Sequence, residues 1–183
     1  MNRSRILLLL LLAGMSGLIL ISFQDESPSE ESLFKEAFKK QYGVYALAIP
    51  VEMEFAGEPV PFHMADVYER YDRELLVNTY WQSQTLLFFK RANRWFPLIE
   101  EILARHGVPE DFKYLALIES GLMHVVSPAG ATGYWQILEG TAKDLGLEVN
   151  RYVDERYHIE KSTEAACKYL LDAYNRFGSW TLA

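Results

Sequence analysis

The strongest constraint on the fold of this chain is a helical repeat of apolar residues that begins near residue 66. Apolar side chains recur every three or four residues among Arg, Glu, Lys and Gln, which places them on one face of an α-helix. Glycines interrupt the repeat at Gly107, Gly121, Gly146 and Gly178, and glycine is the residue at which helices most often end. No series of alternating residues indicates strands in this part of the chain. The pattern predicts a mainly α-helical domain without internal repeats.

The repeat divides into five predicted helices, four of which end at one of these glycines. Pro97 suits the first turn of the second helix, and Ser162 can cap the fifth. The segment before the repeat, residues 33–61, stays open, because it combines a short helical pattern near Phe34 with a piece compatible with extended chain. The expected helices cover residues 66–95, 97–105, 109–121, 141–145 and 162–178.

Length, charge and cysteine content narrow the class of protein. Of the 183 residues, 50% are hydrophobic, which is enough for one modest globular domain with its own core but not for two. The net charge of -7 has the wrong sign for a protein that binds nucleic-acid phosphates. The single cysteine, Cys167, excludes an intramolecular disulfide and a thiolate metal cage, and the four histidines lack ligand spacing. We therefore expect no metal and no nucleic-acid partner.

The first 23 residues have the features of an export signal. Arg3 and Arg5 precede an uncharged apolar stretch, residues 6–23, which is long enough to span a bilayer. A cleaved signal and an uncleaved membrane anchor both stay open. No cysteine follows the stretch, so lipid attachment at a processed N-terminal cysteine is excluded. We expect the protein in the periplasm or cell envelope, in contact with the membrane through this segment.

A glutamate occupies a position where the third predicted helix would place an apolar residue. Advancing about 100° per residue puts Phe112, Leu115, Ala116 and Glu119 on one narrow arc. A carboxylate among apolar side chains loses hydration, which favours its protonated form and keeps a proton available for acid catalysis. The alternative is that Glu119 caps a neighbouring helix or pairs with Arg105.

Small residues and then large polar and aromatic residues follow this helix. Residues 127–133 read Ser-Pro-Ala-Gly-Ala-Thr-Gly, a run that lets backbone approach a ligand closely. Tyr134, Trp135 and Gln136 come next, and they supply two aromatic faces and an amide that suit sugar rings and their hydroxyl or acetamido groups. Each aromatic residue taken singly is more often part of a core.

Taken together, the ordered motifs resemble those of family 1 lytic transglycosylases. The resemblance covers residues 96–183 and implies a lysozyme-like helical fold of the goose-type kind. The expected organisation is residues 1–23 as signal or anchor, 24–33 as acidic linker, 34–95 as N-terminal helical extension and 96–183 as catalytic domain. The motifs are Glu119-Ser120-Gly121, Gly-Ala-Thr-Gly-Tyr-Trp-Gln at residues 130–136, Asp154-Glu155-Arg156 and Ser-Thr-Glu-Ala-Ala at residues 162–166.

The resemblance also implies an activity and a set of site residues. The reaction is cleavage of the β-1,4 bond between N-acetylmuramic acid and N-acetylglucosamine in peptidoglycan, with 1,6-anhydromuramic ends, during cell-wall turnover. A single catalytic acid and base, Glu119, performs it without a metal or organic cofactor, in a protein that we expect to be a monomer. The residues expected to bind the glycan are Ser120, Ser127, Gly133, Tyr134, Trp135 and Gln136.

The sequence departs from the family pattern in two places. After Ile137 the usual Met-Pro continuation is replaced by Leu138-Glu139-Gly140, and the Ala-Tyr-Asn motif expected just beyond Ala183 is not present. The domain therefore looks truncated at its C-terminus, without the tyrosine that normally faces the glutamate. Two other functions stay open: a hydrolytic muramidase of similar fold, and a non-catalytic peptidoglycan-binding protein of the envelope.

Overall fold

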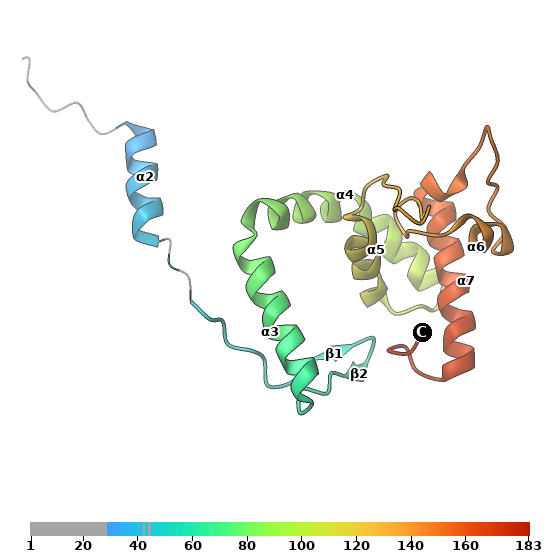
Figure 1. The fold of residues 1–183 in the computed structure, drawn as a ribbon, viewed down its shortest axis with the longest axis horizontal. Helices are drawn as coiled ribbons and strands as arrows, with labels where there is room; N and C mark the ends of the chain where they lie inside the picture. Colours follow the sequence, from blue (N-terminus) through green and yellow to red (C-terminus); the bar gives the residue numbers. More distant parts are fainter. Residues whose placement is uncertain (1–28, 42, 44) are drawn as a thin grey trace, which may run out of the picture. The chain divides into compact units, whose positions relative to one another are not determined.

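The computed structural model describes residues 29–41, 43 and 45–183 (Figure 1). The predicted export signal and residues 24–28 of the predicted linker lie outside these residues. The chain divides into two compact units, Met1–Tyr45 and Ala46–Ala183, which are described separately.

The described part of the first unit is one helix, α2 (Glu30–Gln41). The last residues of the predicted linker, 30–33, therefore belong to a helix. Ser29 explains the start of α2, because its hydroxyl accepts the amide N–H of Ser32 at 3.2 Å, as an N-cap does. Glu30 and Glu31 lie in the first turn and Lys39 and Lys40 in the last, an order that the helix dipole favours.

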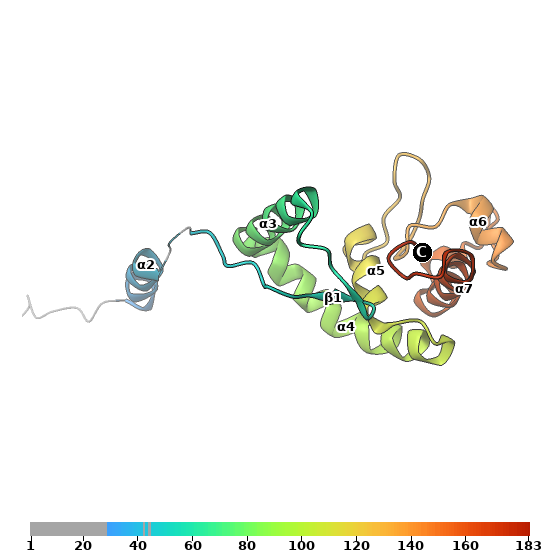
Figure 2. The same cartoon turned by 90° about the horizontal axis from the view of Figure 1, so that it is seen from below.

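The second unit is mainly helical, which confirms the predicted fold class (Figures 1 and 2). Its elements begin with a short antiparallel hairpin, β1 (Glu54–Phe55) and β2 (Glu58–Pro59), and end with a 19-residue helix. Between them lie α3 (Ala65–Tyr80), α4 (Gln82–His106), the 3-10 turn η1 (Glu110–Phe112), α5 (Lys113–Ser120), α6 (Glu139–Asp144) and η2 (Glu155–Tyr157), before α7 (Ile159–Phe177).

The N-terminal part of this unit differs from the predicted helical extension over residues 34–95. Residues 45–53 form no helix, and the hairpin follows them. Ala56 and Gly57 both have positive φ, 53° and 75°, as a two-residue turn between twisted antiparallel strands requires. A two-residue strand has too little periodicity to be recognised in the sequence, so the hairpin was not predicted.

The helix boundaries around Pro97 also differ from the prediction. The expected helix over residues 66–95 is divided at Trp81, and α4 continues through Pro97 in its interior. An interior proline costs about 3 kcal/mol because one helical hydrogen bond is lost. Burial of Ile99 and Ile102, both fully buried one turn further on, offsets that cost. Pro97 therefore marks no helix start, because tertiary packing outweighs the local preference.

The remaining helices agree with the prediction to within a few residues. Gly107, Gly121 and Gly178 follow α4, α5 and α7 in the left-handed conformation, as predicted. The exception is the start of α7, which lies at Ile159 and not at Ser162. The Ser162 hydroxyl donates to the Ile159 carbonyl at 3.2 Å inside the first turn and caps nothing.

The core of the unit lies between the second half of α4 and α7. Leu103 and Cys167 are fully buried there, together with Ile99 and Ile102. Burial raises the pKa of the Cys167 thiol to about 11, so this cysteine behaves as an apolar core residue. By contrast, α3 contains no buried residue. Along the chain, the buried hydrophobic core therefore begins at Ile99.

Candidate functional site

A cavity of about 520 Å³ opens beside the C-terminal end of α5. Its lining comes from the hairpin, η1, α5, the segment before α6, α6 itself, α7 and the last residues of the given sequence. Two of the residues predicted to bind glycan, Trp135 and Gln136, lie on it, as does the predicted catalytic Glu119. The complete lining is Phe55, Phe112, Leu115, Glu119, Trp135, Gln136, Ile137, Leu138, Thr141, Leu145, Ala166, Tyr169, Leu170, Trp180, Thr181 and Ala183.

Glu119 lines the cavity together with Phe112 and Leu115, so the arc predicted from the sequence faces this cavity. The predicted burial of Glu119 is wrong, because the side chain is exposed. Glu119 lies in the last turn of α5, where the arc leaves the core and reaches an open cavity. No hydrogen bond or ion pair joins its carboxylate to another residue of the described chain, and Arg105 pairs instead with Glu164 at 3.8 Å.

Ser120 points the opposite way and is only 6% exposed. Its hydroxyl lies 2.7 Å from the carbonyl oxygen of Tyr134 and accepts the amide N–H of Leu122 at 3.1 Å. Ser120 does not line the cavity. In this arrangement it attaches the end of α5 to the segment that carries Trp135 and Gln136.

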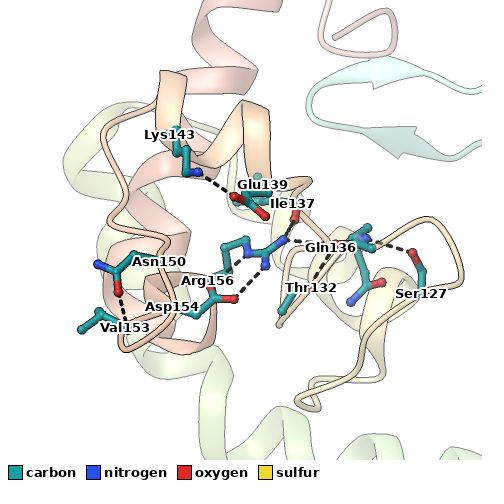
Figure 3. A network of polar contacts seen from close by, with 12 residues as sticks. Ser127, Thr132, Gln136, Ile137, Glu139, Lys143, Asn150, Val153, Asp154 and Arg156 are labelled. Atoms are coloured by element: carbon teal, nitrogen blue, oxygen red, sulfur yellow. Dashed lines mark hydrogen bonds and ion pairs between the residues drawn. The ribbon is translucent and has the colours of Figure 1, made fainter.

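The run of small residues at 127–133 forms a tight loop beside this segment (Figure 3). The Ser127 amide donates to the Ala131 carbonyl at 2.8 Å, and the Ser127 hydroxyl accepts the Ala131 amide N–H at 3.0 Å. Thr132 pairs with both Val126 and Ile137 as isolated antiparallel bridges. The hydrogen bonds of Ser127 thus lie within the loop, and Ser127 does not line the cavity.

Gly133 lets the loop pack directly on the backbone of η2. Its φ is +80°, and a Cβ atom there would lie 2.1 Å from the carbonyl oxygen of Arg156. A side chain at this position would overlap with the backbone of η2, so glycine is needed for packing. The small residue therefore serves contact within the protein and not approach to a ligand.

The three residues after Gly133 point to different places. The Tyr134 ring is buried and packs edge-on against Trp95 at 5.3 Å and His124 at 4.8 Å, away from the cavity. Burial raises the pKa of the Tyr134 hydroxyl. Trp135 lines the cavity, and its indole N–H donates to the Thr163 hydroxyl at 2.9 Å.

Gln136 has a left-handed backbone conformation, with a φ of +49°, which residues other than glycine rarely adopt. Its side-chain amide nitrogen donates to the carbonyls of Val125 at 3.1 Å and Gly133 at 2.9 Å. Within the described chain, no hydrogen bond uses its side-chain oxygen. Gln136 is therefore held at the cavity with a free acceptor.

Arg156 supports the loop from behind, a role that the sequence did not predict (Figure 3). The guanidinium, on a residue only 7% exposed, binds both carboxylate oxygens of Asp154, at 2.9 and 2.7 Å. It also donates to the carbonyls of Gly130 and Ile137, both at 3.1 Å. The ion pair raises the pKa of Arg156 and lowers that of Asp154. Asp154 is only two residues from Arg156 in the chain, whereas the two distant carbonyl acceptors have no signal in the sequence.

The hairpin closes the other side of the cavity, which the sequence also did not predict. The Glu58 carboxylate accepts the amide N–H groups of Trp180 at 2.6 Å and Thr181 at 3.0 Å. It also accepts the hydroxyls of Ser179 and Thr181. These hydrogen bonds, that of the Thr181 hydroxyl first, lower the pKa of Glu58 to about 2.

Aromatic rings continue this contact between the hairpin and the end of the chain. Phe112 packs edge-on against Phe55 at 5.3 Å and against Trp180 at 5.5 Å, and Trp180 stacks on Tyr174 at 4.1 Å. Asp111 joins the same region, because its carboxylate accepts the Ala56 amide N–H at 2.8 Å. Asp111 is thus a structural residue and takes no part in the cavity lining.

The described residues contain neither a cluster suited to a metal ion nor a helix suited to a membrane. Among residues 29–41, 43 and 45–183, no group of three or more His, Cys, Asp or Glu side chains is arranged to hold a metal ion. In the same residues no helix has the length and apolar character needed to cross a membrane. Residues 6–23, on which the expected membrane contact depends, lie outside the described residues.

Comparison with known proteins finds matches for the part of the chain that supplies most of the cavity lining. Residues 97–183 match the family described as Transglycosylase SLT domain. The chain is 31% identical over 94 residues to Membrane-bound lytic murein transglycosylase D of Escherichia coli (strain K12), which covers 50% of this chain and 21% of that protein. The protein of the same name from Escherichia coli O6:H1 matches with the same values. The chain thus spans about a fifth of the length of the curated relatives it matches.

Proposed function

We propose that residues 97–183, which match the family described as Transglycosylase SLT domain, cleave the glycan strands of peptidoglycan. The bond would be the β-1,4 link between N-acetylmuramic acid and N-acetylglucosamine, and the products would carry 1,6-anhydromuramic ends. The domain match and the similarity to a lytic murein transglycosylase support this reaction class.

The observation that carries the proposal is the unpaired carboxylate of Glu119 at the cavity. Among the described residues that line the cavity, Glu119 is the only one with an acidic side chain. The nearby acids are already engaged: Asp111 accepts a backbone N–H, and Asp154 pairs with Arg156. A reaction that needs two free carboxylates has no second candidate here.

A single carboxyl group can perform the reaction if it acts twice. The protonated Glu119 first donates its proton to the glycosidic oxygen, and the bond from that oxygen to C1 of the muramic sugar breaks. The carboxylate then accepts the proton of the C6 hydroxyl, whose oxygen bonds to C1 and closes the anhydro ring. Water is not consumed, and Glu119 ends protonated as it began. Acid–base catalysis of this kind contributes about 10² to 10⁴ in rate.

The predicted glycan-binding residues divide into two groups. We assign direct contact to Trp135 and Gln136, where the indole forms part of the lining and the free side-chain oxygen of Gln136 can accept a sugar hydroxyl. Ser120, Ser127 and Gly133 act by positioning the segment that carries them. Tyr134 faces a separate pocket, described below.

The setting of the activity is the cell envelope. The positively charged and apolar start of the sequence, and the name of the relative as membrane-bound, support export and membrane contact through residues 6–23. We propose that the chain acts there as a monomer in cell-wall turnover.

Purified peptidoglycan tests the proposal directly. The chain from residue 24 onward is incubated with it, Glu119→Gln is the control, and the released fragments are identified by mass spectrometry. Anhydromuropeptides that disappear with Glu119→Gln are the expected result. Fragments with reducing ends would identify a hydrolytic muramidase instead, and binding without release would identify a non-catalytic glycan-binding protein.

A further inference from the structure

A second pocket, of about 600 Å³, lies against α4 and the segment that follows α5. Three of its lining residues are basic and come from α4, and two are aromatic. We call it the basic pocket. Its lining is Lys90, Arg91, Arg94, Trp95, Leu122, Met123, His124 and Tyr134.

The positive charge of the basic pocket has no counter-charge in the lining. None of the lining residues is acidic, and no ion pair within the described chain involves Lys90, Arg91 or Arg94. Lys90 and Arg94 lie one helical turn apart, a spacing at which like charges destabilise a helix by a few tenths of a kcal/mol. An anion in the pocket would remove this repulsion. Such a cluster is conspicuous in a chain whose net charge is -7.

Contacts within the pocket hold two of the cations in place. The Arg91 guanidinium donates to the Gly121 carbonyl at 3.0 Å, and the Arg94 guanidinium carbon lies 4.5 Å from the centre of the Trp95 ring. Burial raises the pKa of the Tyr134 hydroxyl, and the positive charge of Arg94 partly offsets this effect. Arginine stacked on a ring keeps its N–H groups free for a planar acceptor such as a carboxylate.

The basic pocket and the cavity are built from the same two short segments. One segment places Glu119 at the cavity and Leu122, Met123 and His124 at the basic pocket. The other places Tyr134 at the basic pocket and Trp135 at the cavity. The two pockets are therefore connected through short lengths of backbone: Leu122 of the basic pocket is three residues along the chain from Glu119, and Tyr134 directly precedes Trp135.

We propose that the basic pocket binds carboxylates of the peptides that substitute the glycan strand, while the cavity holds the sugars. This inference rests on the proposed function. Every muramic sugar of a peptide-substituted strand carries an acidic peptide on its lactyl group, so a strand in the cavity brings carboxylates close to the cleaved bond. The pocket would then favour peptide-substituted strands over strands from which an amidase has removed the peptides.

The test measures binding in a background that cannot cut. The Glu119→Gln chain is mixed with peptide-substituted strands and with amidase-stripped strands at low ionic strength, and the ratio of the two dissociation constants is determined. The double substitution Lys90→Gln with Arg94→Gln should reduce this ratio roughly fivefold, as expected for two exposed ion pairs. Arg151→Gln with Arg176→Gln is the matched control. Both are exposed and stacked on rings, Tyr152 and Phe177, outside either pocket, and should leave the ratio unchanged.

The outcomes separate this inference from the proposed function. Equal affinity for both kinds of strand, or an equal effect of the control, would overturn the inference even if the active chain releases anhydromuropeptides. A preference that depends on Lys90 and Arg94 would support the inference even if nothing is released.

Vesicles with 30% phosphatidylglycerol provide the last comparison. If the double substitution weakens binding to vesicles but not the strand ratio, the ligand is a lipid headgroup and the inference is wrong.

Discussion

The segment that supports the cavity and the Glu119 carboxylate that lines it differ in how they are hydrogen-bonded. The segment from Ser127 to Ile137 is held by Arg156, by Ser120 and by its own backbone bonds. By contrast, the Glu119 carboxylate forms no hydrogen bond or ion pair with any other described residue. The hydrogen bonds of this region thus fix the supporting segment, while the carboxylate of the reacting group keeps its lone pairs free. Preorganised surroundings with an available central group are what acid–base catalysis requires.

Glu119→Gln gives the sharpest test of that contrast and the largest expected effect. Release of anhydromuropeptides should fall by about 10² to 10⁴, because the amide cannot donate and recover a proton. Thermal stability should not change, since Glu119 is exposed and unpaired. Product release is followed by mass spectrometry and unfolding by circular dichroism. Retained activity with a lowered melting temperature would show that Glu119 is a structural residue and not the reacting group.

Arg156→Met should have the opposite signature, with a large effect on stability. It removes a buried guanidinium that donates to Asp154 and to the Gly130 and Ile137 carbonyls. The Asp154 carboxylate then keeps only the backbone N–H of residue 156, and the two carbonyls keep only their hydrogen bonds from Thr132. Because the Asp154 side chain is 23% exposed, we expect about 2 to 3 kcal/mol less unfolding free energy, measured with urea. Arg105→Met is the control: its pair with Glu164 is exposed and 3.8 Å long, and its loss should cost well under about 1 kcal/mol.

Trp135→Phe tests a residue that belongs to both the support and the lining. It removes the N–H donated to Thr163, and the loss should be about 1 kcal/mol because the Thr163 hydroxyl keeps its own bond to the Ile159 carbonyl. Affinity for glycan strands should also fall, since the indole lines the cavity. Trp81→Phe, at an exposed tryptophan outside either pocket, should change neither quantity.

Glu58→Gln should have the smallest effect, and one that depends on pH. The folded pKa of about 2 lies below the ordinary value of 4.5, so the carboxylate stabilises the folded chain above pH 4.5. That contribution is lost as the pH falls from 4.5 to 2. Urea midpoints of the wild type and the variant should therefore differ at pH 6 and converge near pH 2. A difference that persists unchanged at pH 2 would mean that the carboxylate charge does not hold residues 179–181. Added salt should reduce the difference at pH 6, because Glu58 lies at the surface.

The predictions from sequence succeeded where short-range geometry decides the outcome. Gly107, Gly121 and Gly178 take the left-handed conformation that ends a helix, a property of the residue itself. Glu119 shares the cavity with Phe112 and Leu115, because residues three and four apart lie on one helical face.

The predictions from sequence failed where residues distant in the chain decide the local structure. Pro97 sits inside α4 because burial of the following turn outweighs the lost hydrogen bond. Glu58 meets residues 179–181 more than 120 positions later, and no local pattern marks either partner. The exposure of Glu119 depends on how far η1, α7 and the hairpin stand from the end of α5, which periodicity along one helix does not contain.

The sequence alone is enough to predict the helical class, the helix ends at glycine and the face on which Glu119 lies. These properties depend on φ and on the 3.6-residue period, both of which act within a few residues. By contrast, tertiary contacts place Trp135 and Gln136 at the cavity and Tyr134 at the basic pocket. Tertiary contacts also let Arg156 hold the loop at residues 127–133 and let Glu58 hold residues 179–181. These contacts connect elements far apart in the chain, so they exist only once burial of the core between α4 and α7 has brought those elements together.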